Sequence, residues 1–135
     1  MNNPTRDNVK DWVRHAENDL IALRKLLDGG PWEVVCFHAQ QAAEKMLKAY
    51  LIFRDVHPER THDLSRLLAV CINYDASLGS LLDGCILLAP YAVASRYPDE
   101  TDYDPEDAEG AAQAAEVIYM EIKKKILASD EEQAR

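Results

Sequence analysis

The chain has 135 residues, of which 47% are hydrophobic and 29% charged, with only five glycines and six prolines. This composition excludes a disordered or fibrous protein and predicts one globular domain over residues 1–135, with a core at about 5–128. The net charge of −9 argues at first against a nucleic-acid partner, because phosphate binding is driven by lysine and arginine.

The acidic residues are unevenly distributed along the chain. Residues 99–109 hold seven of the 24 acidic residues and no basic one, so 17 acidic residues face 15 basic ones elsewhere. We expect an acidic loop at 99–107 and a short acidic tail at 129–135. The global charge is therefore a poor guide to partners.

Two long helices are predicted in the first half of the chain, where apolar residues recur at three- and four-residue steps. The first should run from about Thr5 to Asp28 and end at Gly29–Gly30. The second should extend to about Arg54, with Pro31 in the first turn that proline tolerates. Its expected apolar stripe comprises Trp32, Val35, Ala39, Ala42, Ala43, Met46, Tyr50 and Phe53.

Three further helical segments are predicted in the second half. Thr61 is the expected N-cap of a short helix reaching Cys71, and a segment from Ser77 should be kinked or broken at Pro90. The last helix should begin at Asp104–Pro105 and end near Ala128. The series predicts an all-α fold, an antiparallel up-and-down bundle of four long helices and one short one.

The cysteines and histidines indicate neither disulfides nor a metal site. Cys36, Cys71 and Cys85 lie apart among apolar neighbours, which is typical of buried free thiols in a reducing compartment. The histidines form no close-spaced ligand pair with cysteine, so we expect no metal and no cofactor. No apolar run approaches the length of a membrane span, and we expect a cytoplasmic protein without membrane contact.

One polar face of the second helix is the first candidate site. His38, Gln41, Lys45 and Lys48, called the polar strip below, fall within an arc of about 80° opposite the apolar stripe. Such a surface has the chemistry to bind a phosphate or a nucleotide base. The alternative is a solvated face on which Glu44 and Lys48 form an i,i+4 ion pair.

Three blocks together resemble the HEPN domain family: residues 37–49 (FHAQQAAEKMLKA), Thr61-His62-Asp63-Leu64, and Arg96-Tyr97-Pro98. The resemblance extends from about Trp12 to Ile126. It implies a helical bundle that usually forms a homodimer. Many relatives act with a small nucleotidyltransferase as a toxin–antitoxin pair, and others bind nucleotides.

The nuclease members of this family use an arginine followed four to six residues later by a histidine, in some cases as R-x4-H-x-Y. Here Arg96 and Tyr103 fit that pattern, but Thr101 stands at the histidine position. A threonine hydroxyl does not titrate near neutrality and replaces a general acid or base poorly. Arg96 and Tyr103 are therefore candidates only for a degenerate catalytic site.

Other residues of the pattern have alternative roles. His62 is interpreted as a structural hydrogen-bonding group across the bundle, or as part of a phosphate-binding pocket with the polar strip. Arg96 could cap its helix, pair with Glu44 or bind a phosphate. Tyr103 could accept a nucleotidyl group from a partner enzyme, as the family resemblance implies.

The leading hypothesis is a HEPN-type module that homodimerises and binds a nucleotide or a nucleotidyltransferase, using the polar strip with His62 and Arg96. The first alternative is a metal-independent RNA endonuclease toxin with a degenerate Arg96/Thr101/Tyr103 site. The second alternative is a helical interaction protein without catalysis. The apolar segment from Leu81 to Leu88 either lies at the centre of the bundle or is covered by a second subunit, and the family resemblance favours the second subunit.

Overall fold

The computed structural model describes residues 4–92 and 103–134, with side chains for residues 8–92 and 103–128, and these residues form helices without a β-strand. Three helices are long: α1 (Pro4–Leu26), α2 (Trp32–Phe53) and α5 (Pro105–Ala134). Between α2 and α5 lie α3 (Leu64–Ile72), the 3₁₀ turn η1 (Ala76–Leu81), α4 (Leu82–Leu88) and the 3₁₀ turn η2 (Ala89–Ala92).

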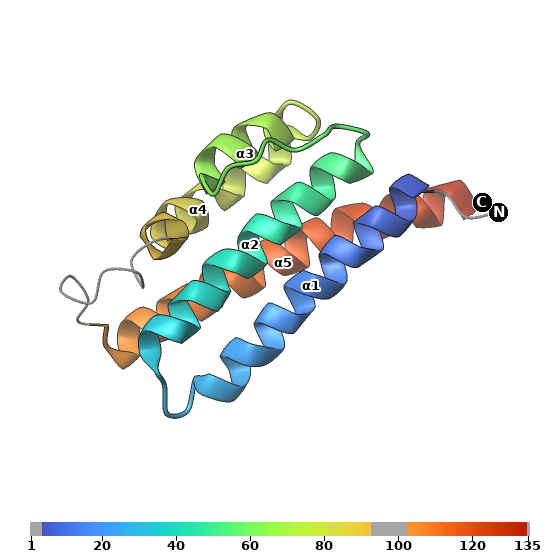
Figure 1. Ribbon diagram of the computed structural model, residues 1–135. Helices are drawn as coiled ribbons and strands as arrows, with labels where there is room; N and C mark the ends of the chain where they lie inside the picture. Colours follow the sequence, from blue (N-terminus) through green and yellow to red (C-terminus); the bar gives the residue numbers. More distant parts are fainter. Residues whose placement is uncertain (1–3, 93–102, 135) are drawn as a thin grey trace.

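The helices form an up-and-down bundle, as the sequence predicts (Figure 1). α1 runs antiparallel to α2, and the succession η1–α4–η2 runs antiparallel to α5. Two contacts also show that η1–α4–η2 and α5 run in opposite directions. Asp75, just before η1, pairs with Lys125 late in α5, whereas Tyr91 at the other end, in η2, packs on Tyr103 just before α5. The fourth predicted helix thus consists of three short segments, the 3₁₀ turn η1, the helix α4 and the 3₁₀ turn η2, and its α-helical part ends before Pro90.

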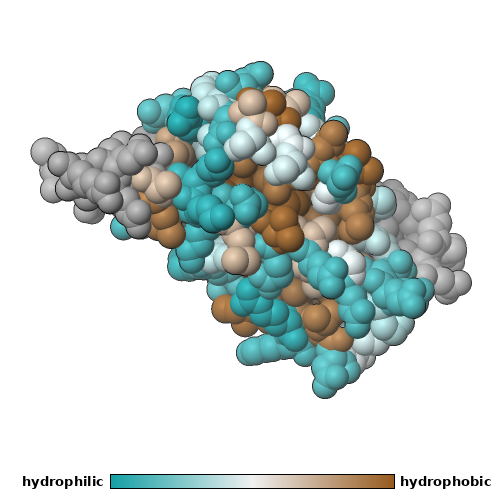
Figure 2. All heavy atoms as spheres, turned by 180° about the vertical axis from the view of Figure 1, so that it is seen from behind, coloured by the Kyte–Doolittle hydropathy of each residue, from teal (hydrophilic) through white to brown (hydrophobic). Residues whose placement is uncertain are grey.

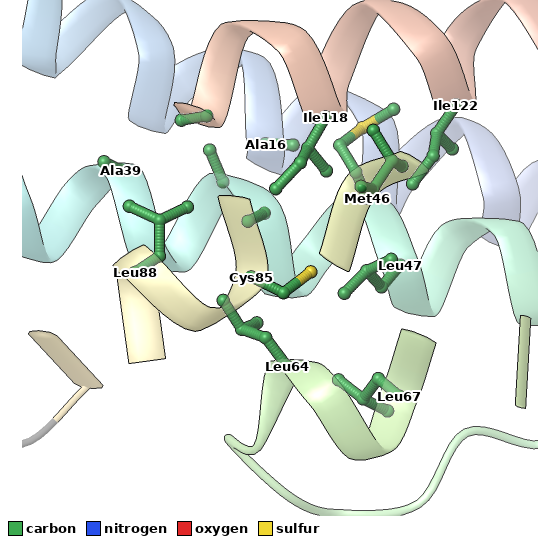
Figure 3. Close-up of a cluster of buried hydrophobic side chains, with 14 of the residues drawn as sticks. Ala16, Ala39, Met46, Leu47, Leu64, Leu67, Cys85, Leu88, Ile118 and Ile122 are labelled. Carbon is green, nitrogen blue, oxygen red and sulfur yellow. The ribbon is translucent and has the colours of Figure 1, made fainter. Parts of the chain in front are cut away.

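α2 is the central helix of the bundle, because α1, α3, α4 and α5 all pack around it (Figures 1 and 3). Four fully buried alanines of α2 allow its neighbours to approach closely. The core that results draws on every helix, and Figure 3 shows ten of its members: Ala16, Ala39, Met46, Leu47, Leu64, Leu67, Cys85, Leu88, Ile118 and Ile122. The three cysteines lie in this core as free thiols, as predicted.

Local chemistry explains most helix boundaries. Gly30 has φ +82° and its N–H bonds to Leu26 O, so the glycine pair ends α1 as predicted. Asp104 and Asp107 exchange side chain-to-backbone hydrogen bonds at the start of α5, the reciprocal pattern of a capping box.

Three boundaries differ from the predictions. Pro31 is the N-cap of α2 rather than its first helical residue. The N-cap of α3 is Asp63, whose carboxylate accepts a bond from Arg66 N, while the Thr61 hydroxyl accepts one from Asp63 N. α5 continues to Ala134 instead of ending near Ala128, so the predicted acidic tail is largely helical.

The C-terminal end of α2 contains a residue in the left-handed region. Asp55 has φ 60°, and Val56 N bonds to Leu51 O across this turn. Because glycine adopts that conformation without the steric cost of a Cβ, we expect Asp55→Gly to raise the free energy of unfolding by roughly 0.5–1 kcal/mol. Urea denaturation checks this expectation; a decrease in stability would mean that the Asp55 side chain makes compensating contacts.

Candidate functional site

The polar strip lies where α1 and α3 approach α2, not on an open face. Lys48 is buried, at 8% exposure, and Gln41 and Lys45 are half-buried. The expectation of a strip opposite the core is therefore wrong in part, because α2 is central and has little surface that neighbours leave uncovered. Two carboxylates, one from α1 and one from α2 itself, organise the strip into two clusters.

Asp19 of α1 is the centre of the first cluster. Its Oδ1 lies 2.8 Å from His38 Nδ1, and its Oδ2 accepts a hydrogen bond of 2.6 Å from Lys45 Nζ. Asp19 is itself buried, and it holds His38 and Lys45 of α2 at the contact between α1 and α2. The cluster has one full negative and one full positive charge, before any proton on His38 is counted.

Glu44 of α2 is the centre of the second cluster, on the side of α3. Its carboxylate accepts hydrogen bonds from Lys48 Nζ at 3.1 Å and Gln40 Nε2 at 3.1 Å, and it lies 2.8 Å from His62 Nδ1. Burial raises the pKa of Glu44, but the hydrogen bonds from His62, Gln40 and Lys48 outweigh it and lower the pKa overall. Glu44 is therefore ionised at neutral pH.

These contacts decide between earlier alternatives for single residues. The predicted i,i+4 pair of Glu44 and Lys48 is confirmed, although it is buried rather than solvated. His62 contacts an acidic side chain across the bundle, the contact that its structural interpretation expects. The ring of His62 is nevertheless exposed. In the polar strip, Gln41 Nε2 donates a hydrogen bond of 2.7 Å to Gln40 Oε1.

Asp19 and Gln40 were missed by sequence reasoning, yet each had a signal. Asp19 follows Ala16 by three residues and precedes Leu23 by four, so it occupies a position on the apolar stripe of α1. Gln40 lies likewise between Cys36 and Ala43. A lone polar residue on an apolar stripe needs a buried hydrogen-bonding partner, and that need points to a network.

Tyr103 lies away from the polar strip. Its ring centroid is 5.6 Å from that of Tyr91, beside the first turns of α2, and burial raises its pKa. Tyr91 also contacts Cys36 near the start of α2. Lys45 of the polar strip lies nine residues farther along this helix, which corresponds to a rise of about 13 Å. Arg96 and Thr101 lie outside the described residues, and so does most of the predicted acidic loop.

A second candidate surface is apolar and lies over α4 and α5. Six large apolar side chains are exposed on these two helices: Leu82, Ile86, Leu87, Val117, Met120 and Leu127. Figure 2, the view from behind, shows hydrophobic side chains gathered over the middle of this side of the molecule. A groove of about 310 Å³ runs through it, lined by Leu87 and Val117 and by small residues such as Gly84, Gly110 and Ala114.

The described part of the chain, residues 4–92 and 103–134, has neither a metal-binding cluster nor a membrane-spanning helix. Within that part no three His, Cys, Asp or Glu side chains are placed to hold a metal ion. No described helix is long and apolar enough to cross a bilayer.

The comparisons with known proteins agree with the fold and the motif blocks. The HEPN domain model matches residues 9–126. The crystal structure of ST0689, described as an archaeal HEPN homologue, is 34% identical with a TM-score of 0.72, and that of TT1696 from Thermus thermophilus is 29% identical with a TM-score of 0.78. Each match covers 87% of this chain and 97% of the other. No curated protein matches. The chain belongs to the HEPN domain family.

Proposed function

We propose that this chain is a HEPN partner-binding module that self-associates through the α4–α5 face and carries no ribonuclease site of the R-x4-6-H type. The observation that supports the proposal is the exposed apolar face itself. Val117 and Met120 are 55% and 63% exposed on adjacent turns of α5, and contiguous apolar surface of this kind marks interaction sites.

A second copy fits this face better than an unrelated surface does. In an antiparallel pairing of two α5 helices about Val117, residues equally far before and after it face each other, so Gly110 meets Lys124 of the other copy. Exposed Glu109 precedes Gly110, which brings opposite charges together at both ends of the pair. In the same pairing Met120 faces Ala114 of the other copy, which lines the groove beside Gly84, so the groove and the protruding methionine belong to one self-complementary surface.

Val117→Asp should abolish self-association. We expect the wild type to sediment as a dimer of the 15.2 kDa chain and the variant as a monomer. An unpaired carboxylate buried at such an interface costs several kcal/mol, which is a weakening of about 100-fold or more. Sedimentation velocity over a range of concentrations measures it.

Ile21→Asp is the matched control, because Ile21 is an exposed apolar residue of a different helix, α1. It should leave the dimer intact. A wild type that remains monomeric at every concentration, or equal loss of association in both variants, would contradict the proposed interface.

The partner to test first is a small nucleotidyltransferase, in a toxin–antitoxin-like pair. The support is the family membership, together with the exposed apolar side chains of α4 and α5. Co-expression with a nucleotidyltransferase encoded beside this gene should give a complex that elutes as one species. Separate elution of the two chains would contradict this part of the proposal.

Nucleotide binding at the polar strip is a second candidate function, favoured by one observation. In each cluster a lysine and a histidine face a single carboxylate, so neither cluster has net negative charge and an anion is not repelled. Titration calorimetry with ATP and GTP on the wild type and on Lys45→Ala tests it. Absence of heat with both nucleotides would discard it.

The RNA endonuclease is the less favoured enzymatic alternative, because a threonine stands at the histidine position of the motif. Incubation of the dimer with total RNA should give no cleavage. Cleavage that disappears in Arg96→Ala would establish a degenerate catalytic site instead.

A further inference from the structure

A hollow with mixed polar and apolar lining lies at the far end of α2 from Tyr103. A hollow of about 500 Å³ is bounded by the first half of α1, the end of α2 and the loop that follows it. A smaller hollow of about 340 Å³ lies on the other side of Trp12, next to His15 and Lys45. Trp12 thus separates two hollows on the α1–α2 seam.

The floor of the larger hollow is apolar and aromatic. Trp12, Ile52 and Val56 line it, and all three are half-buried against the core. Lys48 Nζ lies 5.8 Å from the centroid of the Trp12 ring, within the range of a cation–π contact. Glu44 holds the same ammonium at 3.1 Å, so the indole is packed against a fixed group. The tryptophan therefore offers a positioned, partly open aromatic surface.

The rim of the hollow carries hydrogen-bonding groups and charges of both signs, including the exposed carboxylate of Asp55. Arg60 and His57 are exposed on the loop, and Asn8 is exposed on α1 opposite them. Among the described side chains neither Arg60 nor His57 takes part in an ion pair, whereas Glu59 between them on the rim is engaged by Arg66 at 2.6 Å. Arg60 is thus available to a carboxylate or phosphate, for which its planar fork is suited.

We propose that this hollow binds a small aromatic anion, a planar ring bearing a phosphate or a carboxylate. The ring packs against Trp12 and the apolar floor, and the anionic group is held by Arg60 with His57. The volume falls in the range of small-molecule sites, roughly 300–1,000 Å³. The site is distinct from the proposed dimer face, and it shares only Lys48 with the polar strip.

Trp12 itself reports occupancy. In Trp32→Phe, Trp12 is the sole tryptophan of the chain, and its fluorescence is followed on titration with AMP and with benzoate. We expect saturable quenching by at least one of them, and weaker binding by about ten-fold with adenosine, which lacks the anion, and with inorganic phosphate, which lacks the ring. Quenching by AMP alone assigns a nucleotide-like ligand, and quenching by benzoate alone assigns an aromatic carboxylate.

Arg60→Ala should weaken binding of the active probe by about ten-fold, the effect of one charge-assisted hydrogen bond. Arg54→Ala is the matched control, because Arg54 lies on the same loop but outside the hollow, over the ring of Tyr74. Calorimetry on the wild type repeats both comparisons without the Trp32 substitution. Absence of quenching by both probes, or equal effects of the two arginine variants, would overturn the proposal. Either result leaves the sedimentation test of the dimer unaffected.

Discussion

Glu44→Gln should lower the free energy of unfolding by about 2–3 kcal/mol, the larger of the two strongest effects expected here. The substitution removes the negative charge that compensates Lys48, and the side chains of Lys48 and Glu44 are only 10% and 7% exposed. The expected loss is at the low end for a broken buried pair, because the glutamine oxygen still accepts one hydrogen bond. Urea denaturation followed by circular dichroism measures it.

The stability contribution of Glu44 depends on pH with a definite sign. The pKa of Glu44 is lower in the folded protein than in the unfolded chain, where it is about 4.3. Its contribution is therefore complete above that unfolded value and is lost as the pH falls through the lower, folded value. The stability difference between the wild type and Glu44→Gln should shrink over the same interval. A difference that stays constant there would contradict the assignment.

Two further variants separate charge from shape. Glu59→Gln changes an exposed carboxylate that also pairs with an arginine, Arg66, and should cost less than about 0.5 kcal/mol. Combining Glu44→Leu with Lys48→Met replaces the buried pair by apolar groups of similar size and should recover most of the lost stability. If the double variant does not recover stability, the loss in Glu44→Gln comes from the hydrogen bonds to His62 and Gln40 and not from the uncompensated charge of Lys48.

The sequence predicts the helices well because their stripes and end signals are local. The buried residues of α5 (Ala108, Ala111, Ala115, Ile118, Ile122 and Ile126) recur at three- and four-residue steps, and the helix starts at Asp104–Pro105 as predicted. One boundary error arises where two caps compete, as with Thr61 and Asp63.

The arrangement of the site is less predictable because it depends on contacts across helices. A helical wheel gives the polar strip but treats α2 as having one buried face. With α1, α3 and α5 packed around it, Lys48 and Gln40 are enclosed and need partners. The partners of the two clusters outside α2 are Asp19 and His62, which lie on segments before and after it in the sequence. Periodicity within one segment carries no information about such pairings.

Asp19→Asn should lower the free energy of unfolding by about 2 kcal/mol, because it breaks the contacts to His38 and Lys45 at a buried position. Asp11→Asn is the control on the same helix. Asp11 pairs with Arg14 at 3.5 Å, and both side chains are more than 60% exposed. An exposed pair of this kind contributes roughly 0–0.5 kcal/mol. Equal losses in the two variants would contradict a structural role for the Asp19 cluster.

The same substitution distinguishes a structural strip from a binding strip. In the wild type, an anion that approaches Lys45 has to compete with Asp19, which holds the ammonium at 2.6 Å. Asp19→Asn releases Lys45 and His38, so a polar strip that binds nucleotides should bind ATP about ten-fold more tightly in this variant. Adding Lys45→Ala should cancel that gain. A variant that is less stable and still shows no calorimetric heat with ATP or GTP would leave the cluster a purely structural role.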